Sequence, residues 1–222
     1  MKRSKKQAKE TNKMAYTLNN LGLYFITDSK LTKKTVLQDV DSAIKAGLKI
    51  IQYREKESSS RLMYQEAKEI KELCKKSSAL LIINDRIDIA LAVDADGIHL
   101  GNNDIPYKEA RKLLSNKIIG LTVHNLQEAK EAQRLGADYI GVSPIFETKT
   151  KSDAGAPAGL KLIEEIKKEV ALPIVAIGGI NLDNIDSVIS SGAGSAAVIS
   201  AIITKDNVEA ECKKFIAKFN QL

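Results

Sequence analysis

Cysteine, histidine and long apolar runs are scarce in this chain of 222 residues, and each shortage narrows the class of protein. The only two cysteines, Cys74 and Cys212, lie far apart, and neither belongs to a CxxC pair. This spacing resembles neither a disulfide framework nor a zinc site, so we expect two buried, inert thiols in a reducing cytoplasm. No apolar run approaches the roughly 20 residues of a membrane span, and no apolar signal region follows the basic start. We therefore expect no membrane partner.

The only two histidines, His99 and His124, have no cysteine or second histidine at ligand spacing, which argues against zinc. His99 lies between apolar residues in a predicted strand, a pattern typical of a core histidine with satisfied hydrogen bonds. His124 directly follows a predicted strand and is the better candidate to face a cleft. No Ser-His-Asp arrangement can be derived from these positions.

The net charge of +6 is concentrated at the start of the chain. Residues 1–13 carry six basic side chains and one acidic side chain, and the rest of the chain carries 28 basic and 27 acidic side chains. We interpret residues 1–20 as a short basic extension, solvated or weakly helical, in front of a nearly neutral domain. The charge therefore does not predict nucleic acid as a partner.

Short apolar runs alternate with amphipathic stretches through residues 21–222. Continuous apolar runs of this length are typical of parallel strands that are buried on both faces, and amphipathic periodicity indicates the helices between them. No linker or shift in composition divides this part, which predicts a single α/β domain, a (β/α)8 barrel. The predicted strands are 21–27, 50–54, 80–84, 97–100, 118–122, 139–142, 174–177 and 196–199.

Glycine and serine follow the last two predicted strands. Gly178 and Gly179 let the backbone approach a ligand closely, and Ile199 and Ser200 open a turn. A Gly-Gly pair by itself also occurs in ordinary turns. The loops after strands seven and eight often bind phosphate in barrels, so we favour a phosphate site here.

Two carboxylates, Asp85 and Asp104, follow the third and fourth predicted strands, which are neighbours in a barrel. Together they could hold Mg²⁺, whose preferred ligands are carboxylate, water and phosphate oxygens. Two alternatives stay open. Asp85 could pair with Arg86 or Arg54, and Asp104 could cap the helix that begins near Pro106.

Three cations, Arg54, Lys56 and Lys151, follow predicted strands and would supply positive charge for a diphosphate. Each of them alone could equally be a solvated surface charge. Thr148 and Thr150 alternate with lysines in the long polar loop after the sixth strand, a kind of loop that is usually functional or mobile. Their hydroxyls could reach a ligand when this loop closes.

Six motifs occur in order between about Leu21 and Phe219. They are Gln52-Tyr53-Arg54-Glu55-Lys56, Asn84-Asp85-Arg86, Gly97-Ile98-His99-Leu100-Gly101 with Asp104, Pro144-Ile145-Phe146 with Thr148-Lys149-Thr150-Lys151, Gly178-Gly179-Ile180, and Val198-Ile199-Ser200-Ala201. As a set they resemble the thiamine-phosphate synthase family and are highly specific for it. The family also implies a barrel fold.

The resemblance implies an enzyme of thiamine biosynthesis with two small-molecule substrates, a pyrimidine diphosphate and a thiazole phosphate. They are 4-amino-2-methyl-5-(diphosphooxymethyl)pyrimidine and 4-methyl-5-(2-phosphooxyethyl)thiazole, and the products are thiamine phosphate and pyrophosphate. The enzyme would be a cytoplasmic transferase, and a homo-oligomer is compatible with the sequence.

The resemblance also implies a set of site residues. The pyrimidine diphosphate would be held by Gln52, Tyr53, Arg54, Glu55, Lys56, Asn84, Thr122 and Lys151. The thiazole phosphate would be held by Thr148, Lys149, Thr150, Gly179, Ile199 and Ser200. Mg²⁺ would be held by Asp85 and Asp104, and the catalytic cations would be Lys151, Arg54 and Lys56.

This chemistry suits the residues present. A pyrimidine with an electron-donating amino group can lose diphosphate to leave a stabilised carbocation, which the thiazole nitrogen then captures. Such a reaction needs charge stabilisation of the leaving group, alignment of the partners and exclusion of water, and it needs no general base or covalent nucleophile.

The chain departs from the family pattern at three positions. The family often has Ser at Thr122, Gly at Ser143 and Pro at Glu147. Thr122 keeps the hydroxyl, whereas Glu147 adds a negative charge beside the phosphate loop.

Two other functions fit the same fold. A thiazole tautomerase would depend on a histidine at the position of His124, but that relative lacks the full Asn-Asp and Thr-x-Thr-Lys motifs. A barrel without catalysis could act as a binding protein through its basic extension. The presence of both carboxylates and all three cations argues against this second alternative.

Overall fold

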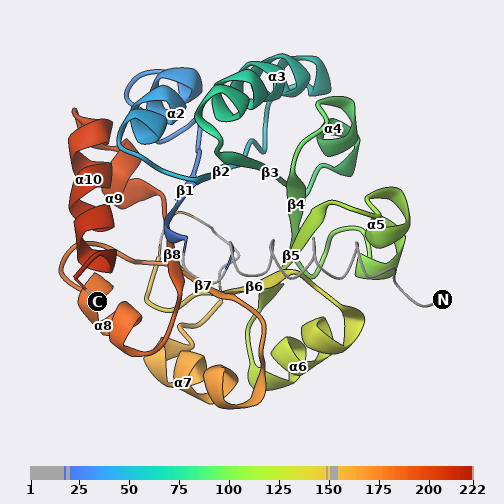
Figure 1. Ribbon diagram of the computed structural model, residues 1–222, viewed down its shortest axis with the longest axis vertical. Helices are drawn as coiled ribbons and strands as arrows, with labels where there is room; N and C mark the ends of the chain where they lie inside the picture. Colours follow the sequence, from blue (N-terminus) through green and yellow to red (C-terminus); the bar gives the residue numbers. More distant parts are fainter. Residues whose placement is uncertain (1–17, 19–20, 149, 151–154, 222) are drawn as a thin grey trace.

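Eight parallel strands form a closed barrel in the part of the chain that the computed structural model describes, which is residues 18, 21–148, 150 and 155–221. The strands follow one another around the barrel in sequence order, and the last pairs with the first from Gly22–Ser195 to Phe25–Val198 (Figure 1). This confirms the predicted barrel. The strands are β1 (Gly22–Ile26), β2 (Ile50–Tyr53), β3 (Leu80–Asn84), β4 (Gly97–Leu100), β5 (Ile118–Val123), β6 (Tyr139–Val142), β7 (Ile174–Ile177) and β8 (Ser195–Val198).

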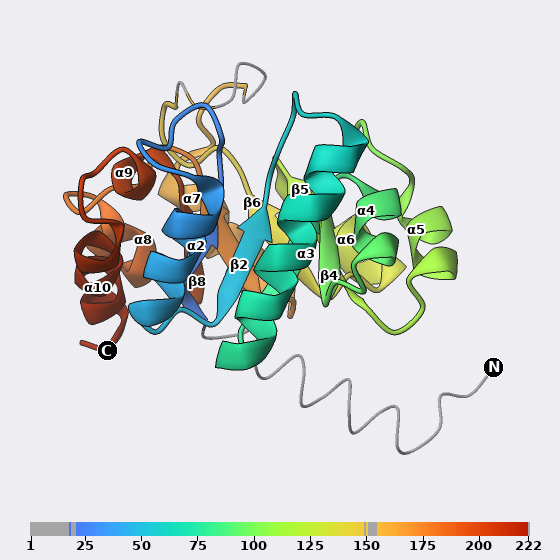
Figure 2. The same ribbon diagram turned by 90° about the horizontal axis from the view of Figure 1, so that it is seen from above.

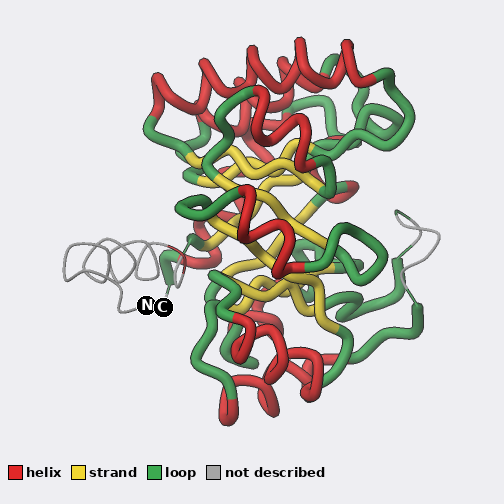
Figure 3. Tube along the Cα trace, turned by 90° about the vertical axis from the view of Figure 1, so that its right-hand side faces the viewer, coloured by secondary structure: helices red, strands yellow, loops and turns green. Residues whose placement is uncertain are grey.

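Helices surround the barrel and cover the outer faces of its strands, so that the sheet forms the inner layer (Figures 1 and 3). A short helix, α9, follows β8 where the sequence indicated only a turn. The helices are α2 (Val36–Lys45), α3 (Ser60–Ser77), α4 (Ile87–Ala92), α5 (Tyr107–Leu113), α6 (Leu126–Leu135), α7 (Gly159–Glu169), α8 (Ile185–Ser190), α9 (Ser200–Ile203) and α10 (Val208–Phe219).

Side-chain caps fix where several helices begin. The Asn125 side chain accepts a hydrogen bond from the Glu128 backbone N–H at 2.9 Å, and Thr35 caps α2 in the same way through Gln38. Such caps satisfy backbone donors that a helix leaves unpaired at its start. Gly136 ends α6 with a φ of +88°, in the left-handed region that favours glycine.

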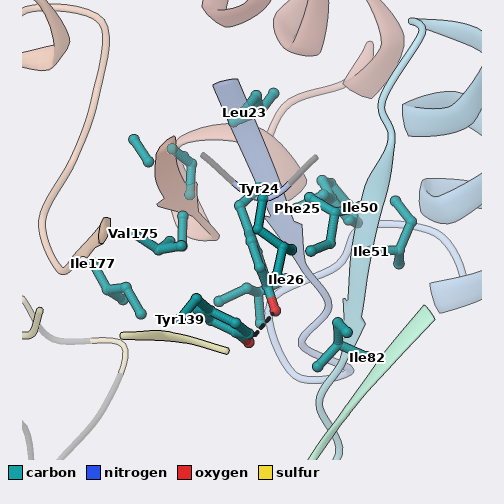
Figure 4. Packing of buried hydrophobic residues seen from close by; sticks show 14 of the residues in the cluster. Leu23, Tyr24, Phe25, Ile26, Ile50, Ile51, Ile82, Tyr139, Val175 and Ile177 are labelled. Carbon is teal, nitrogen blue, oxygen red and sulfur yellow. Dashed lines mark hydrogen bonds between the residues drawn. The ribbon is translucent and has the colours of Figure 1, made fainter. Parts of the chain in front are cut away.

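The core fills the barrel and the layer between strands and helices, and β-branched residues dominate the strands. Strand residues such as Ile50, Ile51 and Ile82 are fully buried, and each such burial contributes roughly 1.5–3 kcal/mol (Figure 4). Two tyrosines, Tyr24 and Tyr139, also lie in the interior. The Tyr139 ring fits against Gly120 because a Cβ there would lie 2.1 Å from its Cζ.

All strand carboxyl ends open on one face of the barrel, which is uppermost in Figure 2. The loops after β1, β2 and β6 rise from this face. Of the predicted extension, 1–20, only Leu18 is described, and its side chain is buried in the core cluster. Within the described residues, we find no helix with the length and apolar character needed to cross a membrane. Cys74 and Cys212 are free and buried, as predicted.

Candidate active site

Two cavities lie side by side at the carboxyl ends of the strands, and Ser143 lines both. The larger is a cleft of about 220 Å³ lined by Arg54, Lys56, Asn84, Asp85, His99, Gly101, Asn102, Asn103, Asp104, Thr122, His124 and Ser143. The smaller, of about 30 Å³, is lined by Ser143, Thr148, Thr150, Ile177, Gly178, Gly179, Ile180, Ala197, Val198, Ile199 and Ser200. We call them the charged cleft and the glycine pocket.

The two predicted metal ligands meet in the charged cleft. Asp85 follows β3 with a φ of +59°, and its Oδ1 accepts a hydrogen bond from Asn84 Nδ2 at 2.6 Å. Its Oδ2 forms an ion pair with the Lys56 ammonium. Asp104 Oδ2 accepts from the Gly101 backbone N–H at 2.7 Å. Asp85 and Asp104 line the same cleft, where burial raises the pKa of the Asp104 carboxyl and its contact with Asp85 raises that pKa further.

The contacts decide between the alternatives that the sequence left open. Asp85 pairs with Lys56, whereas the Arg86 guanidinium pairs with Asp88. Asp104 does not cap the following helix, because the N-cap residue of α5 is Pro106. Asp85 therefore pairs with a different cation from the two that the sequence suggested, and Asp104 is bonded within its own loop.

The carboxyl oxygens of Asp85 and Asp104 fit a hard divalent cation. In the described part of the chain, no cluster of three or more His, Cys, Asp or Glu side chains is placed to hold a metal. A cation bound by this pair would therefore complete its coordination with water and ligand oxygens, which is the manner typical of Mg²⁺.

Arg54 reaches the charged cleft from the end of β2, where Asp28 holds its guanidinium. Arg54 Nη1 donates to Asp28 Oδ2 at 2.5 Å, and the two side chains are only 12% and 9% exposed. Sequence reasoning missed Asp28. Its position could have identified it, because Asp28 directly follows the first predicted strand and the other candidate site residues follow predicted strands as well.

A chain of buried hydrogen bonds crosses the barrel interior below the charged cleft. Gln52 Nε2 donates to the Tyr24 hydroxyl at 2.9 Å, and this hydroxyl lies 2.9 Å from that of Tyr139 (Figure 4). The Tyr139 hydroxyl contacts His99 Nδ1 at 3.0 Å, and His99 Nε2 contacts Thr122 Oγ1 at 2.9 Å. Burial raises the pKa values of the Tyr24 and Tyr139 hydroxyls well above the ordinary value for tyrosine, so both hydroxyls stay neutral. His99 is thus a hydrogen-bonded core histidine, as predicted.

Two residues of the first motif, Tyr53 and Glu55, lie away from the ligand-facing surfaces. The Tyr53 hydroxyl donates to Glu66 Oε2 at 2.7 Å on α3, outside the barrel. Glu55 Oε1 accepts from the Glu57 backbone N–H at 2.7 Å and so shapes the loop after β2. Burial acts to raise the pKa of the Glu55 carboxyl, but hydrogen bonds from Ser29 and the backbone bring it below its ordinary value.

The glycine pocket gathers the predicted phosphate residues of three loops. Gly178 and Gly179 follow β7 with φ values of +103° and +66°, and Ile199 and Ser200 lie at the start of α9. Thr148 Oγ1 accepts from the Thr150 backbone N–H at 3.3 Å. Two predicted site residues, Lys149 and Lys151, lie outside the described residues.

His124 lines the charged cleft, as the sequence suggested, but a backbone carbonyl engages its ring. His124 Nδ1 lies 2.5 Å from the Ser143 carbonyl oxygen, so this nitrogen carries a proton that it donates. The contact connects the end of β5 to the loop that carries Thr148 and Thr150.

The fold and the site define a TIM-barrel enzyme, with its polar groups on the face where such barrels bind their ligands. Residues 23–202 match the family model described as thiamine monophosphate synthase. The chain is 50% identical to the thiamine-phosphate synthase of Methanosarcina barkeri over 90% of both chains. It is 51% identical to that of Methanosarcina mazei over 90% of this chain and 83% of the relative.

A solved structure agrees with these relatives. The thiamine phosphate pyrophosphorylase from Pyrococcus furiosus superposes with a TM-score of 0.86 at 39% identity, over 92% of this chain and 98% of that one. The chain belongs to the thiamine-phosphate synthase family, which is a family of transferases.

Proposed function

We propose that the protein couples 4-amino-2-methyl-5-(diphosphooxymethyl)pyrimidine to 4-methyl-5-(2-phosphooxyethyl)thiazole, releasing pyrophosphate and thiamine phosphate. The observation that carries the proposal is the pair of adjoining cavities, one charged and one lined by glycine and hydroxyl groups. Two phosphorylated substrates that react with each other need two such sites with a common border. Ser143 lies on that border.

The charged cleft is the site for the pyrimidine diphosphate. Arg54 and Lys56 face its anionic end, and Asn84 and Thr122 offer polar atoms to the ring. Gln52 acts from below, through the Tyr24 hydroxyl to which it donates. Tyr53 and Glu55 support this site from outside the cleft: Glu55 Oε1 holds the backbone of the loop after β2, and the Tyr53 hydroxyl binds Glu66 on α3.

The glycine pocket is the site for the thiazole phosphate. Gly179 brings the backbone close to the ligand, and the hydroxyls of Thr148 and Ser200 supply donors to phosphate oxygens. Thr150, Lys149 and Ile199 complete the site in this proposal. The thiazole ring would then lie toward Ser143 and the pyrimidine.

The reaction begins as the bond between the pyrimidine methylene carbon and the diphosphate oxygen breaks, and the electron pair leaves with the diphosphate. The amino group on the ring stabilises the cation that remains. The thiazole nitrogen donates its lone pair to the methylene carbon and forms the new C–N bond. Arg54, Lys56 and Lys151 stabilise the charge that grows on the diphosphate, and this stabilisation is the main catalytic contribution of the protein.

Asp85 and Asp104 would hold Mg²⁺, which supplies further charge neutralisation for the diphosphate when it is bound. Lys56 pairs with Asp85 in the structure. The Lys56 ammonium is half exposed, so it can turn from the carboxylate to a phosphate oxygen without losing much burial.

The substrates are small phosphorylated molecules, and we propose a cytoplasmic enzyme without nucleic-acid or membrane partners. The buried free thiols of Cys74 and Cys212 support a reducing compartment. The near-neutral charge of the barrel supports the absence of a nucleic-acid partner.

The test is pyrophosphate release by the purified protein with both substrates, measured for the wild type, Lys151→Ala and His124→Ala. Lys151→Ala should lower kcat by about two orders of magnitude, the usual cost of removing a donor that acts on the transition state. His124→Ala should cost much less, because the coupling needs no proton transfer from the imidazole. A tautomerase would show the reverse order, and coupling that survives loss of Lys151 but disappears without His124 would refute the mechanism.

A further inference from the structure

The first two strand ends are joined to each other at Thr27 and Arg54. The Arg54 backbone N–H donates to Thr27 Oγ1 at 2.9 Å, and this hydroxyl donates to the Arg54 carbonyl at 3.2 Å. The Thr27 backbone N–H donates to the Gln52 carbonyl at 3.0 Å. Thr27 is 1% exposed, so these bonds are shielded from water. The backbone from which the Arg54 side chain projects is therefore fixed by β1.

Asp28, the next residue, fixes the side chain. Its Oδ2 accepts from Arg54 Nη1 at 2.5 Å, and the carboxylate is itself held in a tight turn. Asp28 Oδ1 accepts from the Lys30 backbone N–H at 3.1 Å, and its carbonyl accepts from the backbone of Leu31 and Thr32. A carboxylate with so little freedom restricts the guanidinium that it binds, because the guanidinium is planar and its donors point in fixed directions.

The arrangement is not explained by stability alone. Arg54 Nε is buried and has no hydrogen-bond acceptor in the described part of the chain, and an unpaired buried donor lowers stability. Buried ion pairs also lose much of their attraction to the cost of removing both charges from water. The Asp28 carboxylate moreover offsets part of the positive charge that would attract an anion. An arrangement with these disadvantages fits a role in orientation.

We infer that Asp28 is a positioning residue that holds the Arg54 guanidinium in the orientation required by the leaving diphosphate. The inference rests on the proposed function, because it assigns Arg54 to the diphosphate. One edge of the guanidinium is occupied by Asp28, which lies behind Arg54, outside the residues that line the charged cleft. The terminal guanidinium donors that Asp28 does not occupy act on the ligand. Asp28 itself touches no substrate.

Asp28→Asn keeps the size of the side chain and removes its charge, so Arg54 should lose its fixed orientation. The expected result is a fall of about tenfold to a hundredfold in kcat/KM, the usual cost of a small misplacement of a catalytic group. The KM for the pyrimidine diphosphate should rise, whereas the KM for the thiazole phosphate should stay unchanged. A change that only loosened the fold would affect both.

Asp39→Asn is the matched control. Asp39 is a buried carboxylate on α2 that accepts from Thr32 Oγ1 at 2.5 Å, so it holds the same loop after β1 without touching Arg54. The Asp39→Asn substitution should leave the KM values for the pyrimidine diphosphate and the thiazole phosphate unchanged. An equal loss in Asp28→Asn and Asp39→Asn would show that loop stability, and not the orientation of Arg54, causes the effect.

The decisive experiment is a double-mutant cycle with Arg54→Ala. If Asp28 acts through Arg54, Asp28→Asn should change kcat/KM in the Arg54→Ala protein by no more than about twofold, the usual scatter for independent changes. The same large loss in both backgrounds would overturn the inference. The same four proteins can also be compared without turnover, by measuring their affinity for inorganic pyrophosphate in the presence of Mg²⁺ by calorimetry. If the wild type releases no pyrophosphate from the two substrates, the proposed function is refuted. The calorimetric cycle would still measure the coupling between Asp28 and Arg54.

Discussion

Gly179 offers a direct test of the glycine pocket because the structure leaves no room for a side chain there. Its φ is +66°, and a Cβ would lie 2.4 Å from the Glu147 carbonyl oxygen and 2.8 Å from Phe146 Cβ. The loop after β7 therefore packs directly on the loop after β6, which carries Thr148 and Thr150. Gly179→Ala should push these loops apart and widen the pocket between them.

The magnitude follows from two contributions. An alanine with a left-handed backbone costs about 1 kcal/mol. The close contact adds about 1–3 kcal/mol, the usual cost of overpacking, because the nearest atom belongs to the backbone and cannot turn aside. The free energy of unfolding should therefore fall by about 2–4 kcal/mol.

Gly136→Ala separates the two contributions. Gly136 has a φ of +88° at the end of α6, but a Cβ there would meet nothing closer than the Tyr107 hydroxyl at 3.6 Å. This variant should lose only the backbone contribution of about 1 kcal/mol. Urea unfolding of both variants measures the difference, which is the cost of the contact with Glu147.

Calorimetry with each substrate then connects the packing to the site. In Gly179→Ala the affinity for the thiazole phosphate should fall about tenfold or more, because 1.4 kcal/mol of lost contacts already has this effect. The affinity for the pyrimidine diphosphate should stay within about twofold of the wild type. Equal losses for both ligands, or a thiazole-phosphate affinity like that of Gly136→Ala, would refute the assignment of the glycine pocket.

Two further predictions concern carboxylates. Asp85→Ala should raise the barrier by about 3 kcal/mol, whereas Asp206→Ala, at an exposed residue paired with Lys33, should have no effect. Full wild-type turnover in excess chelator would contradict the role of Asp85 in metal binding. Burial raises the pKa of the Asp39 carboxyl, so the folded protein binds this proton more tightly than the unfolded chain. Its contribution to stability is present below about pH 4 and is lost as the pH rises through the raised pKa. Asp39→Asn should therefore gain stability relative to the wild type as the pH rises above about 4 in urea unfolding, and a constant difference would argue against the raised pKa.

The meeting of Asp85 and Asp104 could be predicted because it depends only on strand order. Each carboxylate follows a short apolar run, and successive strands of a barrel are neighbours. The register pairs Asn84 with His99, so the two loops begin at the same level. What the sequence could not decide was whether structural partners occupy the carboxylates. That depends on side-chain directions, which place Lys56 and not Arg86 on Asp85.

The directions in which the side chains of the first motif point could not be predicted from the sequence either. Successive strand residues point to opposite faces, so Gln52 and Tyr53 must diverge. In a half-exposed strand the apolar pattern would tell which of them faces inward. Barrel strands are buried on both faces, and Ile50 and Ile51 are equally apolar. The apolar pattern therefore does not tell which alternate residues of this strand point into the barrel. In the structure the Gln52 side chain points into the barrel and donates to the Tyr24 hydroxyl, whereas the Tyr53 side chain points outward to α3.

Asp28 shows why a positioning residue is harder to find than a ligand-binding one. Its chemistry lies entirely in its pairing with Arg54, which is 26 positions away, and no local motif signals such a pair. Arg54 itself was found because it belongs to a dense polar motif at a strand end. The closure of β1 onto β2, with Phe25 opposite Ile51, brings the two residues together. A second buried carboxylate, Asp39, faces Thr32 and does not contact Arg54. Burial and charge therefore do not distinguish the two carboxylates; only the partner does, and the double-mutant cycle measures that partnership.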